Sequence, residues 1–214
     1  MWSLGGSFEN NPRAGVLLVM HSFYGLSWCF KDLNFPDEVW KRPATWVSCV
    51  SFYAFSLILC TPILCQVAPE KCFGPAPFTH YSWTFIGLAS FITGIFYHYG
   101  SDAQKYFQIR AQPGKLITEG FWRYTRNPNY LGEFLIYTGY ITVSGHSMPA
   151  ILVVTSWVTL MFPSILKKEC RLERYSEWSE YKKKTPMILP SVSMVLSDLK
   201  YLFRPLPEER NQKW

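Results

Sequence analysis

Charged side chains are scarce in this sequence, and the scarcity is uneven along the chain. They make up 17% of the 214 residues, whereas a soluble globular domain carries about 25%. Five runs hold at most one charged residue each, and each approaches the roughly 20 residues that cross a bilayer core as a helix. The sequence therefore excludes an ordinary soluble domain and predicts an all-α, multispanning transmembrane bundle with about five spans, at residues 14–30, 43–66, 78–99, 130–144 and 149–166.

The motifs of soluble nucleotide-binding and hydrolytic enzymes are also missing. The sequence has no GxSxG, Walker loop or GxGxxG, and it lacks the alternation of strands and helices that a soluble Rossmann domain needs. Its histidines in or beside the runs have no metal-ligand spacing with a carboxylate, so no metal site is expected. No cysteine pair forms a CxxC, but Cys65 and Cys72 flank one loop, where a disulfide can form if that side is oxidising.

Basic residues concentrate on one side of the predicted bundle. If the five runs span a membrane, residues 31–42, 100–129 and 167–214 share a side, and they hold every lysine and arginine except Arg13 and Lys71. The positive-inside rule predicts this asymmetry for loops that set topology. The net charge of +6 therefore indicates contact with anionic membrane lipids rather than with nucleic acid.

The start of the fourth run is marked by helix signals. Asn127 is a natural N-cap, and Pro128 suits the first turn, where its missing N–H is no loss. Further along the same helix, Gly132 and Gly139 lie seven residues apart. Small residues at this spacing predict that a neighbouring helix approaches closely.

A polar stripe runs along another face of that helix. A carboxylate and three phenols fall at i, i+3, i+7 and i+10, namely Tyr130, Glu133, Tyr137 and Tyr140. A charge at membrane depth costs at least about 2.5 kcal/mol, so it normally faces a partner or a watery cavity. Glu133 is therefore a candidate site residue. The alternative is an ion pair with Arg123 or Arg126 that only fixes the start of the helix.

Two charged segments follow on the positive side. Lys105, Lys115, Arg123 and Arg126 lie before the fourth run and suit a phosphate or carboxylate, although topology-setting charge explains them equally well. In residues 167–190, apolar side chains recur every third residue opposite many charges, which predicts an amphipathic helix on the membrane surface, near lipid headgroups or over a cofactor. Residues 191–214 are expected to be a polar C-terminal tail.

Three blocks of sequence resemble a known family of membrane proteins. SDAQKYF, LITEGFWRYTRNPNYLGE and KKECRLERYSEWSEYKKKTPMILP are similar to the steroid-oxidoreductase-like family related to 3-oxo-5-alpha-steroid 4-dehydrogenases. The wider set includes sterol reductases, isoprenylcysteine carboxyl methyltransferases and phosphatidylethanolamine methyltransferases. The resemblance covers about residues 95–190 within a single domain of residues 1–190.

This resemblance implies a cofactor and separates two branches. The reductases bind NADPH and reduce a polarised C=C bond of a lipid, whereas the methyltransferases bind S-adenosylmethionine. Asn129 and Glu133 match an Asn and a Glu that the steroid 5-alpha-reductases place in their NADPH pocket. The methyltransferases typically have a His where this chain has Asn127, and a Glu-Glu pair after the last span where this chain has only Glu169.

The expected function is therefore that of an NADPH-dependent lipid or sterol reductase. Tyr130 and Tyr137 are the expected proton donors, and the expected cofactor-binding residues are Arg123, Arg126, Asn129, Tyr130 and Glu133. Glu70 lies on the wrong side for the catalytic acid that the reductases carry in their N-terminal half. The alternatives are an S-adenosylmethionine-dependent methyltransferase and a non-catalytic subunit that contacts other membrane subunits through its tail. The family points to the endoplasmic reticulum, and the subunit hypothesis leaves the mitochondrial inner membrane open.

Overall fold

A computed structural model describes residues 11–37, 41, 43, 45–69 and 72–202. These residues form helices and contain no strand, which confirms the all-α prediction for this part of the chain. Glu70 lies outside the described residues. The helices have the following bounds: α2 Pro12–Asn34, α3 Trp46–Val67, α4 Ser82–Ala111, α5 Phe121–Tyr124, α6 Pro128–Ser144, α7 Ser147–Ser156, the π-helix η2 Trp157–Met161, α8 Phe162–Leu172, α9 Trp178–Lys184 and α10 Val192–Leu202.

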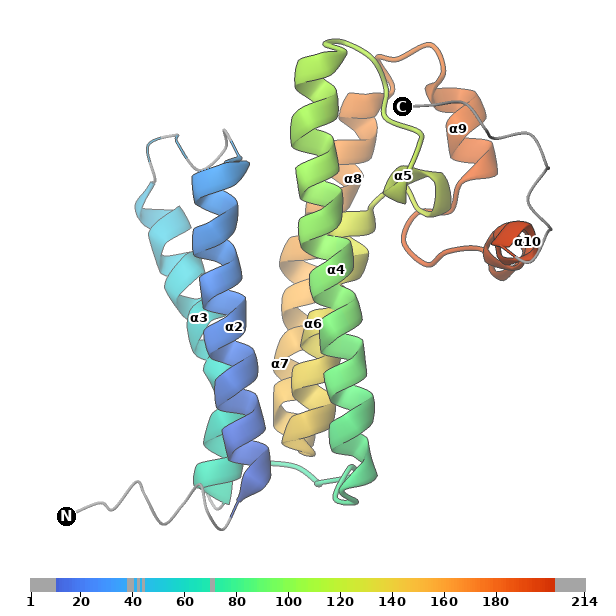
Figure 1. The fold of residues 1–214 in the computed structure, drawn as a ribbon. Coiled ribbons are helices and arrows are strands. Elements are labelled where there is room, and N and C mark those ends of the chain that lie inside the picture. The colour runs from blue at the N-terminus through green and yellow to red at the C-terminus, as the bar shows by residue number, and fades with distance from the viewer. Residues whose placement is uncertain (1–10, 38–40, 42, 44, 70–71, 203–214) are drawn as a thin grey trace.

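Each of the five apolar runs coincides with a long helical segment, and these segments stand side by side (Figure 1). Only α7, η2 and α8 together, Ser147–Leu172, are long and apolar enough among the described residues to identify a membrane span by length and composition. Just 22% of the most apolar window of this segment is buried inside the protein, unlike the core helix of a soluble protein. The fold is thus compatible with a membrane protein, and the count of five spans stays a prediction.

The centre of the bundle is the close pair of α4 and α6. A Cβ atom on Gly132 would lie 2.4 Å from the backbone nitrogen of His98, and one on Gly139 would lie 2.7 Å from the carbonyl oxygen of Gly87. Because glycine has no Cβ, the two backbones meet at distances that a side chain would prevent. The structure therefore confirms the close approach that Gly132 and Gly139 predict, and α4 is the partner.

The helices also enclose an apolar core, to which α2, α4, α6 and α7 contribute. Its buried members include Leu17, Phe91, Ile136 and Val143. Away from the core, many large apolar side chains of α2, α4 and α7 are exposed. At one end, Cys65 and Cys72 form a disulfide across the connection from α3 to α4, as the cysteine spacing allowed.

The segment after the last apolar run differs from the prediction. Residues 167–190 do not form one amphipathic surface helix, because α8 ends at Leu172 and α9 begins at Trp178 after a turn. Leu172, Tyr175, Trp178 and Tyr181 pack against Trp122 of α5. These side chains are therefore covered by protein, whereas Leu189 stays exposed.

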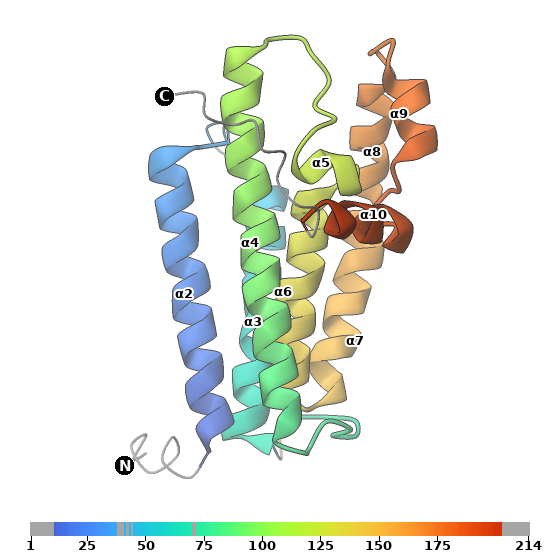
Figure 2. The same ribbon diagram turned by 45° about the vertical axis from the view of Figure 1, so that its right-hand side comes forward.

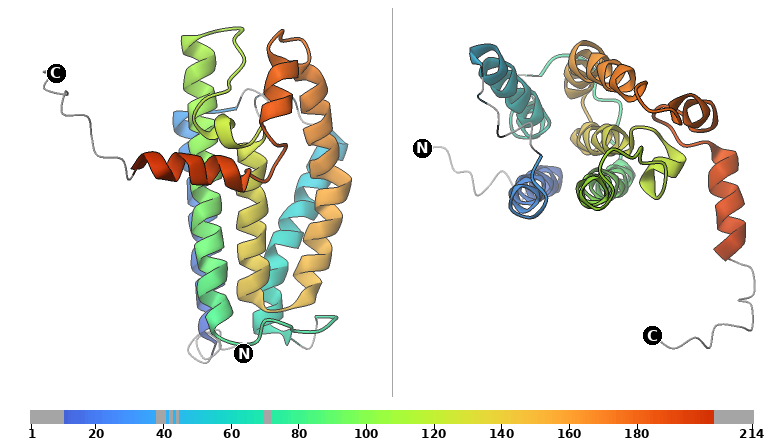
Figure 3. Two further views of the ribbon diagram at one scale, coloured as in Figure 1. Left: turned by 90° about the vertical axis from the view of Figure 1, so that its right-hand side faces the viewer. Right: turned by 90° about the horizontal axis from the view of Figure 1, so that it is seen from above.

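The expected polar tail contains a helix as well. Residues Val192–Leu202 form α10, which lies across the direction of the long helices rather than along it (Figure 3). At the same end of the bundle lie α5, α9 and the last turns of α4 (Figure 2). The polar chemistry of the molecule is concentrated near this end.

Candidate functional site

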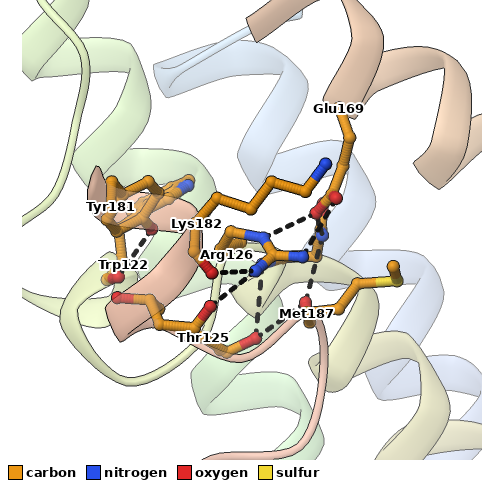
Figure 4. A network of polar contacts seen from close by, with 9 residues as sticks. Trp122, Thr125, Arg126, Glu169, Tyr181, Lys182 and Met187 are labelled. Atoms are coloured by element: carbon orange, nitrogen blue, oxygen red, sulfur yellow. Dashed lines mark hydrogen bonds and ion pairs between the residues drawn. The ribbon is translucent and has the colours of Figure 1, made fainter. Parts of the chain in front are cut away.

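An arginine and a glutamate tie the start of α6 to α8. The Arg126 side chain is 6% exposed and that of Glu169 is 5% exposed. The guanidinium donates to both carboxylate oxygens, at 2.8 Å from Nε and 3.0 Å from Nη2 (Figure 4). Such a bidentate, charge-assisted pair fixes both distance and orientation.

The same arginine also fastens the segment after α9. Its Nη1 donates to the carbonyl oxygens of Lys182 and Thr185, at 3.0 and 2.6 Å, and its backbone N–H donates to that of Pro186 at 2.9 Å. Four of its five side-chain N–H bonds are therefore engaged within the protein. Arg126, expected to bind cofactor, acts in this structure as the centre of a clamp between three segments.

Asn127 contributes to this clamp rather than to helix capping. It is the N-cap of α6, as expected, but its side chain makes no cap hydrogen bond. Its amide donates instead to Glu169 Oε1 at 3.2 Å and to the Met187 carbonyl oxygen at 3.0 Å. Asn127 is itself buried, and its amide adds a donor to the Glu169 carboxylate, a buried charge that would be very costly if unpaired.

A buried tyrosine completes the clamp on the other side. The Tyr181 hydroxyl donates to the Trp122 carbonyl oxygen at 2.7 Å and so joins α9 to α5. Burial raises the pKa of Tyr181 above its usual value of 10.0, because the phenolate is less well solvated than the phenol. The phenol consequently stays a hydrogen-bond donor throughout the physiological pH range.

Glu133 lies deeper in the bundle and has no arginine beside it. Its carboxylate accepts a hydrogen bond from the Tyr137 hydroxyl, one turn further along α6, and its Oε1 lies 3.5 Å from His98 Nδ1 on α4. Arg126 pairs with Glu169, and Arg123 pairs with Asp198 at 2.8 Å. The ion pair of Glu133 with Arg123 or Arg126, which was the alternative explanation, is therefore not formed.

The polar contacts continue from Glu133 to the opposite side of His98. His98 Nε2 lies 3.9 Å from a carboxylate oxygen of Asp102, and that carboxylate accepts a hydrogen bond from Lys31 on α2. All three residues are buried. We call Lys31, His98, Asp102, Glu133 and Tyr137 the buried polar chain; it connects α2, α4 and α6.

A cleft of about 210 Å³ meets one end of the buried polar chain. The cleft lies between the C-terminal ends of α2 and α4. Lys31 and Asp102 line it and are also members of the buried polar chain. Two further cations line it: Lys105, 3.7 Å from Asp37, and Arg110, whose guanidinium lies 3.4 Å from the centre of the Tyr106 ring. Asp37 and Asp102 also line the cleft and pair with Lys105 and Lys31, so Arg110 supplies its positive charge that no carboxylate among the described residues balances.

The remaining expected site residues are distributed around this arrangement. Asn129 lies one turn before Glu133, and its buried Oδ1 has no hydrogen-bond partner. Tyr130 is partly exposed, with Lys168 Nζ 5.7 Å from its ring centre. Arg123 is largely exposed at the surface beside α10. Asn129, Glu133 and Tyr137 thus lie on one face of α6. Arg123 and Arg126 do not join them, because they pair with Asp198 and Glu169.

Sequence reasoning missed Lys31, His98 and Asp102. In the sequence, His98 is a histidine without metal-ligand spacing, Lys31 is one of the basic residues of the positive side, and Asp102 belongs to a block that resembles the family. A usable signal existed: His98 and Asp102 are four residues apart and therefore share a helical face. The sequence does not show that this face of α4 meets Lys31 of α2 and Glu133 of α6.

The family of the chain follows from comparison with known proteins. Residues 25–185 match the family DUF1295, described as a protein of unknown function, and the chain belongs to this family. The match begins in α2, well before the residue 95 at which the recognised resemblance begins. No curated protein and no solved structure matches the chain.

Proposed function

We propose that this protein is an integral membrane enzyme that binds NADPH and reduces a polarised C=C bond of a lipid or sterol. The observation that carries the proposal is the buried Glu133 carboxylate, 8% exposed, beside the unpartnered Oδ1 of Asn129. Among the residues that the structure describes, no lysine or arginine pairs with Glu133. Glu133 accepts one hydrogen bond, from Tyr137, so its carboxylate and the Asn129 oxygen keep acceptor positions for a ligand that brings hydrogen-bond donors.

The nicotinamide end of NADPH fits this pair chemically. Its carboxamide has two N–H donors and one oxygen acceptor, while Glu133 and Asn129 each present an acceptor on the same face of α6. When bound, NADPH supplies a hydride to the substrate. The role of the chain's own residues is to orient the carboxamide and to keep water from the reacting carbon.

The cleft between the C-terminal ends of α2 and α4 is the proposed site for the phosphates of the cofactor. Lys105 and Arg110 line it, and lysine and arginine side chains bind phosphate through charge-assisted hydrogen bonds. Lys31 also lines the cleft, but it is held by the buried Asp102 carboxylate. Arg126 is a poorer candidate, because releasing it would leave Glu169 buried and unpaired. Arg123 is available to a phosphate only if it leaves Asp198.

A tyrosine hydroxyl is proposed to donate the proton to the substrate. Tyr137 is 2% exposed and its hydroxyl is directed to Glu133. Tyr130 lies on the same stripe, closer to the positive end, and is partly exposed. We therefore assign Tyr130 the contact with the substrate and Tyr137 the orientation of Glu133.

We also propose that the five long segments all span the membrane. Exposed apolar side chains occur along α2, at Leu18, Phe23, Leu26 and Phe30, and along α7, η2 and α8, at Ile151, Val154, Val158 and Phe162. Lipid would cover them, since apolar surface of this extent is rare on soluble monomers. The helical backbone satisfies its own hydrogen bonds, as a span must.

The proposal is tested by thermal unfolding of the detergent-solubilised full chain with NADPH and S-adenosylmethionine in parallel. NADPH at a hundred times its dissociation constant should stabilise the fold by about 2.7 kcal/mol. In Glu133→Gln the affinity should fall about tenfold, because a charge-assisted hydrogen bond is stronger than a neutral one by roughly 1 to 1.5 kcal/mol. Phe134→Leu, on the exposed side of α6, is the matched control and should bind normally.

Two other results of this titration would favour a different function. A shift with S-adenosylmethionine alone would identify a methyltransferase. No shift with either nucleotide, in a protein whose circular dichroism shows a folded helical state, would point to a non-catalytic subunit of a membrane complex. The endoplasmic reticulum remains the proposed location for a reductase.

A further inference from the structure

Helix α10 is held across the bundle by one acidic side chain. Asp198 accepts from Arg123 Nη2 and from the Tyr124 hydroxyl, both at 2.8 Å. This fastens α10 to α5, at the same height as the start of α6 (Figures 1 and 2). The helix lies beyond residue 185, where the family match ends, so its role is not part of what the chain shares with that family.

The inner side of α10 faces the protein. Met194, Val195 and Asp198 are half-buried, and Met194 lines a cleft of about 320 Å³ with residues of α5 and α9. These three positions share one helical face. The orientation of α10 about its own axis is therefore fixed by contacts with the rest of the chain.

Two other faces of α10 remain exposed and differ in polarity. Val192 and Leu196 lie one turn apart and are 71% and 53% exposed. Ser193 and Ser197 are exposed on a stripe about 100° round the helix from them. A helix lying in a membrane surface, with its third side against protein, needs one apolar and one polar outer face of this kind.

Neighbouring residues extend the apolar face and add charge. Leu189, just before α10, is 66% exposed, and we call Leu189, Val192 and Leu196 the tail patch. The nearby α9 ends in three exposed lysines, Lys182, Lys183 and Lys184. Apolar side chains beside a group of cations complement the acyl boundary and the headgroups of an acidic leaflet.

The depth of α10 agrees with such a position. The 17 residues of α6 are about 26 Å long at 1.5 Å per residue, close to the roughly 30 Å of the hydrocarbon core. If α6 spans, its first residue, Pro128, lies near the interface on the positive side. Since α10 lies at that height and across the spans, its axis runs along the membrane surface.

We propose that the tail patch docks on the acidic lipid leaflet of the positive side, with α10 in the plane of the interface. Val192, Leu196 and Leu189 enter the boundary between headgroups and acyl chains, and Lys182–Lys184 meet anionic headgroups. The inference rests on the proposed spanning arrangement and is independent of the proposed reductase activity.

Single-cysteine variants of the full chain test the proposal. Leu196→Cys and Ser197→Cys are labelled with a fluorophore whose emission shifts to the blue in apolar surroundings, and reconstituted in phosphatidylcholine vesicles containing phosphatidylserine. Label at position 196 should emit blue-shifted light and be quenched several-fold more strongly by brominated lipid than label at position 197. The background replaces the free cysteines by serine: Cys29, Cys49, Cys60 and Cys170.

Equal, water-like emission from positions 196 and 197 would overturn the proposal. Val158→Cys is the reference, because Val158 is exposed in the apolar segment Ser147–Leu172. If label at Val158 is lipid-buried while label at 196 is in water, docking has failed but spanning has not. If both are in water, the spanning arrangement itself has failed.

The charge requirement is tested separately. Quenching at position 196 should fall several-fold in vesicles of phosphatidylcholine alone and in the variant with Lys182, Lys183 and Lys184 changed to Gln. Equal quenching in both lipids would refute the preference for an acidic leaflet. Blue-shifted emission that appears already in detergent and grows with protein concentration would instead identify a second copy as the occupant.

Discussion

The clamp around Arg126 gives the sharpest prediction, the effect of changing Glu169 to Gln. The two side chains are almost fully buried and joined by hydrogen bonds of 2.8 and 3.0 Å. Removing the negative charge leaves the Arg126 guanidinium buried without its counter-ion, and breaking one partner of a buried pair costs about 3 to 5 kcal/mol. Because both residues are almost fully buried, water does not screen the ion pair, and the full destabilisation is expected.

The assay is thermal unfolding of the detergent-solubilised chain, followed by far-ultraviolet circular dichroism. At about 2 to 4 °C per kcal/mol for a chain of this size, Glu169→Gln should lower Tm by roughly 6 to 20 °C. The double change Arg126→Met with Glu169→Leu should recover much of that loss, because replacing both charges by apolar groups is often neutral.

An exposed ion pair supplies the control. Lys184 and Glu180 form an i,i+4 pair with side chains 70% and 74% exposed, so Glu180→Gln should leave Tm unchanged within error. A fall of less than 2 °C for Glu169→Gln would refute the reasoning, since the clamp would then be no stronger than a surface pair.

Three further predictions follow from local features. Gly132→Ala should lower stability by about 1 to 3 kcal/mol through overpacking against α4, whereas Gly15→Ala, which meets nothing within 4 Å, should be neutral or slightly stabilising in the same thermal assay. In alkylation followed by mass spectrometry, Cys65 and Cys72 should react only after reduction, and Cys65→Ser should cost about 2 kcal/mol of stability. The pKa of Tyr181 is higher in the folded than in the unfolded protein, so the stabilisation from its protonated hydroxyl is complete below pH 10.0, the usual tyrosine value. This stabilisation is lost as the pH rises towards the folded pKa. In Tyr181→Phe, Tm should therefore fall less steeply with pH in this range. An unchanged slope in that variant would refute the assignment.

The positions of the long helices can be read from local patterns in the sequence. Five apolar runs predicted five long helical segments, and the Asn127-Pro128 pair predicted the first residue of α6. Gly132 and Gly139 predicted a close helix contact, and the isolated carboxylate of Glu133 indicated a buried polar site. These features depend on residues within a few turns of one another, so periodicity and helix-start signals suffice to read them.

Two features of the C-terminal region were not read from the sequence. The apolar pattern of residues 167–190 was predicted as one helix, but the segment forms α8 and α9 with a turn between them, and its aromatic side chains pack against Trp122. Likewise the polar composition of residues 191–214 hid α10, whose exposed serines and half-buried Asp198 are arranged on separate faces. The amino-acid composition of a segment does not show which face of a helix packs against protein and which stays exposed.

Which charged groups meet depends on how the helices pack in three dimensions. Arg126 and Glu169 are 43 residues apart, and Lys31 and Asp102 are 71 apart. Any of the nearby carboxylates was a plausible partner for Arg126 in the sequence. In the structure Arg126, just before α6, meets Glu169 of α8, while the packing of α6 against α4 places Glu133 near His98. The physical reason is that an ion pair needs atoms within about 4 Å, a distance that helix packing sets and sequence spacing does not.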